Sequence, residues 1–372
     1  MFEFLEDFGL KEYFLTHKIV LASYILFGSF ILKLLIGRVE KFKRNDRNIL
    51  ITYVIFLMLF AGTRAKNIGV DTGNYYLYFF IPATRAGNIF DVFTILNTDF
   101  LFELIISLTA WTNNYNIVLL TIAIVLNVLL YKFVREFTDY GNRGSSLLLF
   151  LTIASGFSFI NLEINIMRNA LAIGFIFLSI NYAIKENYYK CALLLITALL
   201  FHRTSIILAV IIFAIVFAKK VPLKYYYAFY LLAILLSAAG FGFHSISFLA
   251  ELGNEDLSNL SYEGETNYRI GFRLDFVMFN TFFLILFAKF TNLNSYRESF
   301  LIKYFILSSV VFFFNFYIPF SDRFGLFSWL IIPLLLFDIV NKKFPKKKIF
   351  INTLVLISFY ILNNIILFPT KF

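Results

Sequence analysis

Ionisable side chains interrupt the apolar segments of this chain at several points. Arg168 begins one apolar segment, and His202 and Arg203 divide the otherwise apolar stretch 191–218. An ionisable residue at membrane depth is costly, and it is therefore a candidate for function. Arginine binds phosphate through a planar, bidentate guanidinium group. These residue types therefore indicate a site for a phosphorylated ligand.

Seven cationic residues share this position at the edge of an apolar segment. They are Arg64, Arg168, His202, Arg203, Arg269, Arg273 and Arg323. The aromatic residues suited to stacking on sugars are Tyr75, Tyr76, Tyr78, Tyr262 and Tyr268. An arginine-lined cavity with such aromatic walls suits a lipid-linked pyrophosphate that carries sugars. The alternative is that the arginines only extend their charged ends toward the membrane surface.

Segment 61–80, AGTRAKNIGVDTGNYYLYFF, places three charges directly after an apolar run. Its glycines permit tight turns, and Asp71 and Thr72 can hydrogen-bond the backbone of such turns. Arg64 would either bind a pyrophosphate or pair with Asp71 and fix the shape of the loop. A solvated loop with a stop-transfer arginine is the third interpretation.

Arg168 stands where a cation is disfavoured, at the predicted external start of a helix. Both the positive-inside rule and the helix dipole oppose a positive charge there. We therefore expect a negative partner for Arg168, either Glu163 or an anionic ligand.

The elements that position these residues are predicted from composition. The 372 residues are 60% hydrophobic and 15% charged, and the mean hydropathy is +0.79. Soluble domains have about 25% charged residues and cannot bury so much apolar surface. The apolar runs do not alternate with polar residues as the strands of a β-barrel do. The sequence therefore predicts an all-α, polytopic integral membrane protein with about 12–13 transmembrane helices.

We expect these helices in twelve apolar runs. They lie near residues 19–37, 48–62, 116–134, 145–160, 168–184, 188–201, 204–218, 225–243, 274–290, 301–318, 324–340 and 349–368. A shorter run, 99–112, is expected to be re-entrant or interfacial. The chain is predicted to form a single membrane-embedded domain, 1–372, with external loops 63–98 and 244–273 on the active-site side.

The basic residues predict the orientation in the membrane. Six segments hold 22 of the 33 Lys and Arg residues, and they are 33–47, 131–144, 185–190, 219–224, 289–303 and 341–348. If they share one side, that side is cytoplasmic and the N-terminus is external. If 99–112 crosses the membrane, the orientation of every segment before it is inverted, and segment 33–47 lies outside. The excess of basic residues, a net charge of +10, then orients the protein in the membrane and contacts anionic lipid headgroups. This charge therefore gives little support to nucleic-acid binding.

Several other chemistries lack support in the sequence. The one cysteine, Cys191, lies in an apolar run, so neither a disulfide nor a thiol metal site is expected. The three histidines lack ligand spacing, and neither a P-loop nor an Asp-rich metal motif is present. The first residues are acidic, unlike the start of a signal peptide. We expect no metal and no cofactor.

An ordered set of motifs resembles the EpsG family, which are Wzy-type polymerases of bacterial exopolysaccharide, capsule and O-antigen. The motifs are GTRAKNIGVDTGNYY (62–76), Phe102-Glu103, MRNALAIGF (167–175) and LLFHRTS (199–205). The family pattern is Arg, then Gly-x-Asp-Thr-x-x-Tyr, then Arg-x-x-Leu-Ala, then Phe-His-x-Ser/Thr. This chain has Asn169 where the family often has Gln. The resemblance covers residues 60–210, and beyond them it rests on topology and the late arginines.

The resemblance implies a glycosyltransferase with a GT-C-like membrane architecture in the bacterial inner membrane. Its active site would face the periplasm or cell exterior. It would transfer a growing glycan from undecaprenyl pyrophosphate to the non-reducing end of another lipid-linked repeat unit. The implied partners are undecaprenyl-pyrophosphate-linked oligosaccharide repeat units, the lipid bilayer and a chain-length regulator protein.

The resemblance also implies roles for individual residues. The catalytic residues would be His202, Asp71 and Arg168. The residues that bind pyrophosphate or glycan would be Arg64, Arg203, Arg269, Arg273, Arg323, Tyr75, Glu103 and Asn169. Either His202 or Asp71 would accept the proton of the acceptor hydroxyl, and His202 is favoured because its ordinary pKa lies near neutrality. The arginines would neutralise charge on the diphosphate leaving group.

Two other functions stay open at this point. One is a ligase or other transferase of lipid-linked glycans. The other is a polysaccharide flippase or secondary carrier. Carriers often show paired halves and helices broken at mid-membrane, whereas this sequence shows no internal repeat and gathers its polar residues on one predicted side.

Overall fold

A computed structural model of the chain describes residues 9–96, 99–139, 144–243, 269–291 and 295–367. Every secondary-structure element in these ranges is a helix, which confirms the all-α prediction. The elements divide by their contacts into two compact units, each described by itself. The first unit is Met1–Ala209 with Val340–Phe372, and the second is Val210–Ile339. The single membrane-embedded domain stays a prediction.

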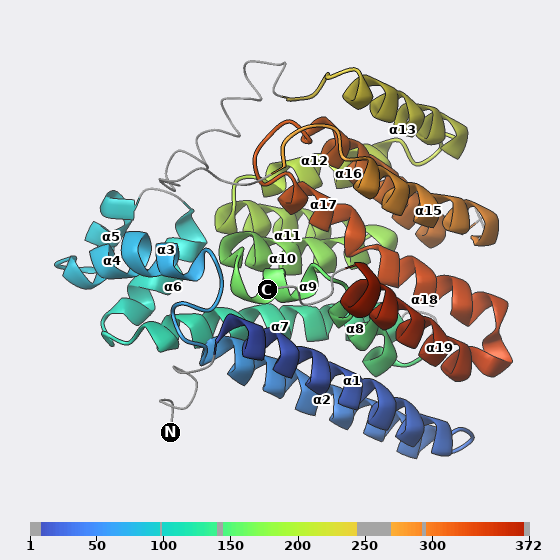
Figure 1. Cartoon of the computed structure of the whole chain (residues 1–372), viewed down its shortest axis with the longest axis horizontal. Helices are drawn as coiled ribbons and strands as arrows, with labels where there is room; N and C mark the ends of the chain where they lie inside the picture. The colour runs from blue at the N-terminus through green and yellow to red at the C-terminus, as the bar shows by residue number, and fades with distance from the viewer. Residues whose placement is uncertain (1–8, 97–98, 140–143, 244–268, 292–294, 368–372) are drawn as a thin grey trace. The chain divides into compact units, whose positions relative to one another are not determined.

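The first unit is built on long apolar helices that pack along one another. Helix α1 (Leu10–Leu34) lies beside α2 (Val39–Gly62), and both pack against α8 (Ser146–Ala154). Helix α10 (Met167–Ile184) packs against α7 (Tyr115–Asp139) and α11 (Tyr188–Phe201), as Figure 1 shows. Near the C-terminus, η4 (Pro345–Lys347) leads into α19 (Lys348–Ile361), which packs against α1 and α8 and continues into the π-helix η5 (Leu362–Leu367).

The segment 63–98, which we expected to be an external loop, is largely helical. It contains α3 (Thr72–Tyr75), the π-helix η2 (Tyr76–Phe80), α4 (Ile81–Arg85) and α5 (Ile89–Leu96). The aromatic side chains Phe79 and Phe80 are buried there, and burial of such rings stabilises helices that propensity alone would not. The second predicted loop, 244–273, lies outside the described residues over 244–268.

Helix α6 (Phe100–Ala110) is the short element predicted near 99–112. Its 11 residues make a rod of about 16 Å, roughly half the thickness of the hydrocarbon core. It packs against α4, α5, α7 and α11. Helix α6 therefore joins the segment 63–98 to the long helices of the first unit.

Two predicted spans are broken into shorter helices. Over 145–160, α8 ends at Ala154 and α9 (Phe159–Ile164) begins after Gly156 and two serines. The start of α8 is fixed by Asp46, whose carboxylate accepts hydrogen bonds from the Ser145 hydroxyl and two backbone amides. Over 324–340, α17 (Asp322–Trp329) is followed by α18 (Ile332–Lys343), which carries Pro333 in its first turn.

The second unit surrounds α16 (Tyr296–Phe314). This helix packs against α13 (Leu223–Ala238), α15 (Leu274–Phe290) and α17. The boundary between the two units, after Ala209, falls within α12 (Ser205–Phe217). Arg297 on α16 forms a buried bidentate pair with Asp338 on α18, with Nε–Oδ2 at 2.6 Å and Nη2–Oδ1 at 2.9 Å. Breaking such a pair leaves a buried charge, so it ties α16 to α18.

Five segments of the described chain are long and apolar enough to cross a membrane. They are Leu10–Leu34, Tyr115–Asp139, Met167–Ile184, Asp322–Lys343 and Pro345–Leu367. Four further apolar helices are shorter, and they are Phe100–Ala110, Tyr188–Phe201, Ser205–Phe217 and Leu223–Ala238. These helices identify a multi-pass membrane protein, and the total of about 12–13 spans stays a prediction.

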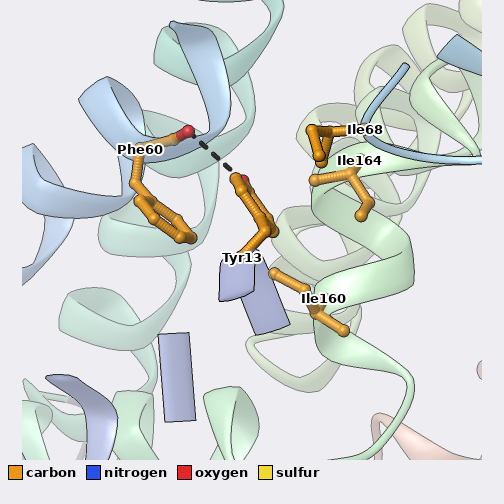
Figure 2. Close-up of a cluster of buried hydrophobic side chains, with 5 residues drawn as sticks. All are labelled: Tyr13, Phe60, Ile68, Ile160 and Ile164. Carbon is orange, nitrogen blue, oxygen red and sulfur yellow. Dashed lines mark hydrogen bonds between the residues drawn. The ribbon is translucent and has the colours of Figure 1, made fainter. Parts of the chain in front are cut away.

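A buried hydrophobic cluster holds the segment after α2 against α1 and α9. Tyr13 stacks on Phe60 with ring centroids 4.1 Å apart, and its hydroxyl donates to the Phe60 carbonyl at 3.2 Å. Ile68, Ile160 and Ile164 complete the cluster, as Figure 2 shows. Because Ile68 belongs to the chain between α2 and α3, the cluster anchors the glycine-containing loop that follows.

Candidate active site

Asp99 is the centre of a buried polar cluster in the first unit. Its Oδ2 accepts a hydrogen bond from Arg168 Nη1 at 2.7 Å and lies 3.3 Å from His202 Nδ1. Its Oδ1 accepts a hydrogen bond from the backbone amide of Arg203 at 3.2 Å. One carboxylate therefore joins two residues that the sequence identified separately.

Three helix ends bring these side chains together. Asp99 is the residue before α6, with an extended backbone, where acidic residues favour helix initiation. Arg168 is the second residue of α10, and His202 follows the last residue of α11 in an extended conformation. Because α11 packs against both α6 and α10, the three ends converge.

The cluster is nearly enclosed. Asp99 is 3% exposed, Arg168 is 7% exposed and His202 is 9% exposed. Burial alone would raise the pKa of the Asp99 carboxyl, but the hydrogen bonds and charges of His202 and Arg168 outweigh burial and hold that pKa below its ordinary value. Asp99 is thus an anion at neutral pH, and it offsets the unfavourable charge of Arg168 at the start of α10.

Aromatic rings flank the guanidinium group of Arg168. Its Cζ lies 5.4 Å from the ring centroid of Phe79 and 6.0 Å from that of Tyr75. Tyr75 and Phe79 also contact the ring of Phe102, at centroid distances of 5.5 Å and 5.7 Å. Helix α3, the π-helix η2 and α6 therefore build an aromatic wall beside the cluster, and π-helical turns often occur at functional sites.

Arg64 is held by the protein on several sides. It is 1% exposed, and its Nη2 donates to the Ile164 carbonyl at 3.1 Å and to the Thr72 hydroxyl at 3.4 Å. Its Nη1 donates to the Ala61 carbonyl. The Thr72 hydroxyl also donates to the Ile164 carbonyl, at 2.9 Å. These contacts clamp the loop through Thr72 and Ile164, whereas the expected pairing of Arg64 with Asp71 and its binding of pyrophosphate both stay predictions.

Gly69 allows this clamp to close. Its φ is +99°, and a Cβ there would lie 2.7 Å from the Thr72 hydroxyl, 2.8 Å from Asn165 Oδ1 and 2.9 Å from the Ile164 carbonyl. A side chain would therefore be both strained and obstructed. This explains physically why the Gly-x-Asp-Thr segment begins with glycine.

Glu163 is not the partner of Arg168, so the first expectation for that partner was wrong. Its Oε2 accepts a hydrogen bond from Asn127 Nδ2 at 3.0 Å. Glu163 lies outside the five candidate spans and is 3% exposed. Burial raises the pKa of its carboxyl to about 8, although the Asn127 hydrogen bond and the charge of Arg64 oppose this shift. Glu163 is therefore predominantly neutral at pH 7.

The remaining residues that the sequence placed in the first part of the site are close to these elements. Asp71 is 4% exposed and precedes α3, and its carbonyl accepts the Tyr75 amide at 3.0 Å. Glu103 lies one turn after Asp99 on α6 and is 3% exposed, while Asn169 follows Arg168 on α10 and is 7% exposed. The Arg203 side chain is exposed. Their predicted roles stay predictions.

The three late arginines belong to the second unit. Arg269 is exposed, and Arg273 forms a bidentate pair with Asp275 at 3.0 Å and 2.7 Å. The Cζ of Arg323 lies 5.0 Å from the ring centroid of Phe320. The predicted sugar-stacking residues Tyr262 and Tyr268 lie outside the described residues.

The family model described as the EpsG family matches residues 47–370. No curated protein and no solved structure matches the chain.

Proposed function

The chain belongs to the EpsG family, and from this premise we propose that it polymerises lipid-linked glycan repeat units. Membership indicates a role in polysaccharide biosynthesis. The proposed reaction transfers a growing glycan from undecaprenyl pyrophosphate to the non-reducing end of another lipid-linked repeat unit. We place this reaction on the outer face of the bacterial inner membrane.

The contact between Asp99 and His202 is the observation that carries this proposal. A carboxylate at Nδ1 favours the imidazole tautomer with its proton on that nitrogen, which leaves Nε2 as the acceptor. A histidine oriented in this way is suited to general base catalysis. We propose that Nε2 of His202 accepts the proton of the acceptor hydroxyl as its oxygen bonds to the anomeric carbon.

Bond formation at the anomeric carbon is balanced by cleavage of its bond to the diphosphate. Undecaprenyl pyrophosphate leaves with the electron pair, and negative charge grows on the phosphate oxygens. Arg168 is a fixed cation beside His202, since both contact Asp99. We propose that Arg168 stabilises the leaving group, because preorganised charge in an enclosed site is most effective where charge develops.

The surrounding elements have supporting roles in this proposal. Tyr75 belongs to the aromatic wall, and such rings suit stacking on sugars. Arg64, Gly69 and Thr72 fix the loop that leads into α3 and therefore position Asp71 and Tyr75. Asp99 is a positioning residue, because it acts through His202 and Arg168.

The polymerase proposal is tested by deletion of the gene and electrophoresis of the surface polysaccharide. Single-repeat glycans on a normal lipid core are expected. Complete absence of surface repeats would instead indicate a ligase or flippase, and an unchanged ladder would overturn all three functions. Polymerisation by purified protein on lipid-linked repeat units, with and without EDTA, tests self-sufficiency and the expected independence from metal.

A further inference from the structure

A cavity of about 680 Å³ lies in the first unit, and none of Asp99, Arg168 and His202 lines it. Its volume is in the range of small-molecule sites, which is roughly 300–1,000 Å³. Its polar lining consists of His17, Lys18, Asn161, Asn165, Asn363 and Asn364. The aromatic residues Phe14 and Phe157 also line it. The cavity is therefore amide-rich with aromatic and aliphatic walls.

Several of these polar groups have unused hydrogen-bonding capacity. His17 is 3% exposed and Asn363 is 0% exposed. The His17 Nε2 and the Asn363 Oδ1 have no hydrogen-bond partner among the described residues, and neither has the Asn165 Oδ1. Each of these three atoms is itself fully buried, so the amide groups that a ligand in the cavity can reach belong to the partly exposed side chains of Asn161, Asn165 and Asn364.

The walls of the cavity are fixed by hydrogen bonds between distant segments. Lys18 Nζ donates to the Asn364 carbonyl at 2.9 Å, and the Tyr360 hydroxyl donates to the Lys18 carbonyl at 3.0 Å. Asn364 Nδ2 donates to the Ser155 carbonyl at 2.9 Å. Asn363 and Asn364 belong to the π-helix η5, a rare element that often occurs at functional sites. The cavity is thus a built feature of α1, η5 and the α8–α9 connection.

The cavity shares its boundary with the motif loop. Gly69, Ile164 and Asn165 line it, and the Ile164 carbonyl is the acceptor for Arg64 and Thr72. A ligand in the cavity therefore contacts the same loop that leads to Asp71 and Tyr75.

We infer that this cavity binds an uncharged sugar unit of the glycan. Asparagine side chains donate and accept hydrogen bonds, which matches hydroxyl and N-acetyl groups. No carboxylate is present among the described lining residues, and the only ammonium group, that of Lys18, is engaged by the Asn364 carbonyl. A phosphate would call for more positive charge than the single, already engaged ammonium group of Lys18, and a lipid chain would place hydrocarbon against the polar side chains of the lining. The identity of the sugar as part of the lipid-linked glycan rests on the proposed function.

The test places a cysteine in the cavity. Asn161 is half-buried in its wall, whereas Asn67 is an exposed residue of the motif loop outside the lining. Asn161→Cys and the matched control Asn67→Cys are labelled with a water-soluble maleimide, and the wild-type chain gives the background because Cys191 is buried. The added probes are oligosaccharide released by mild acid from lipid-linked repeat units and, separately, undecaprenyl phosphate. Asn364→Cys is a second probe, on η5.

We expect the released oligosaccharide to slow labelling of Asn161→Cys and Asn364→Cys roughly fivefold when it is at four times the Kd of the variant being labelled. Labelling of Asn67→Cys should not change, and undecaprenyl phosphate should have no effect. Protection by undecaprenyl phosphate alone would identify a lipid site and overturn the inference. Labelling at an unchanged rate with either probe would also overturn it.

A kinetic measurement separates this inference from the proposed function. Asn161→Ala should raise the KM for lipid-linked repeat units by about tenfold and leave kcat unchanged, since it removes binding without touching the Asp99 cluster. If the oligosaccharide protects the cysteines but the wild-type protein forms no polymer, the cavity binds sugar and the proposed polymerase function is refuted. Polymer formation with an unchanged KM and no protection would refute the cavity site alone.

Discussion

Arg168 Nη1 donates a hydrogen bond to Asp99 Oδ2 at 2.7 Å, across 69 residues of sequence. The contact joins the start of α10 to the start of α6, and His202 meets the same carboxylate oxygen from the end of α11. A histidine at a helix end is an ordinary feature, whereas a cation at a helix start is unfavourable without a negative partner. Their shared carboxylate makes them one unit, and this unit is the basis of the proposed chemistry.

The fork geometry of Arg168 should matter as well as its charge. Arg168→Lys keeps a positive charge but loses the planar group that lies beside Tyr75 and Phe79 and contacts Asp99. We expect normal membrane levels and a loss of long polysaccharide chains, with in vitro turnover reduced roughly 100-fold. The measurement is a polysaccharide gel with an immunoblot for the protein. A wild-type ladder from Arg168→Lys would remove Arg168 from the site.

The two roles of Arg64 can be separated by comparing stability with activity. Arg64→Lys removes the second guanidinium nitrogen, which donates to the Ala61 carbonyl while Nη2 contacts Thr72 and Ile164, so we expect the free energy of unfolding to fall by roughly 2 kcal/mol along with activity. The measurement is a thermal melt in detergent beside an activity assay, with Lys66→Met as a control in the same loop. Loss of activity at unchanged stability would instead favour direct binding of pyrophosphate.

Glycine should be required at position 69 and not at position 73. Gly69→Ala introduces a methyl group at positive φ within 2.9 Å of three atoms, so stability should fall by about 1–3 kcal/mol. Gly73→Ala meets only the Lys66 carbonyl at 4.0 Å and should be neutral. Melting temperatures of the two variants check this contrast, and equal melting temperatures would contradict the described loop.

Glu163 predicts a specific dependence of stability on pH. Its pKa in the folded protein, about 8, is above the ordinary glutamate value, so the folded state holds a proton that the unfolded state releases. Its stabilising contribution is therefore complete in acid and is lost as the pH rises toward 8. We expect the melting temperature to fall between about pH 5.5 and 8.5 in the wild type, and Glu163→Gln to reduce this fall. An equal fall in both proteins would contradict a neutral buried Glu163.

The sequence was sufficient for the helical membrane class, and it singled out Arg168 and His202, which the fold brings to one carboxylate and whose roles stay predictions. Arg168 and His202 could be found because a charge in an apolar run stands out, and Gly69 because of its place in a motif. Asp99 was missed because it precedes a short helix and because its partners lie 69 and 103 residues away. The sequence feature that could have identified Asp99 is its position directly before an apolar run, because acidic residues commonly precede helices.

The patterns in the sequence also did not predict the breaks between helices or the π-helical turns. The span predicted at 145–160 is divided into α8 and α9 on either side of Gly156, η5 ends the helix predicted at 349–368, and η2 lies in the segment predicted as an external loop. Glu163 was proposed as the partner of Arg168 because it is near in sequence. The fold instead pairs Glu163 with Asn127 on α7 and directs Arg168 toward α6.

The central claim is that Asp99 organises His202 and Arg168 for glycan transfer, and Asp99→Asn tests it most directly. The measurement is the single-turnover rate of chain extension by purified protein on lipid-linked repeat units, with Asp139→Asn as a matched exposed control. We predict a rate reduced roughly 10²–10⁴-fold in Asp99→Asn, with substrate binding retained and the control unchanged. A wild-type rate in folded Asp99→Asn would contradict the account.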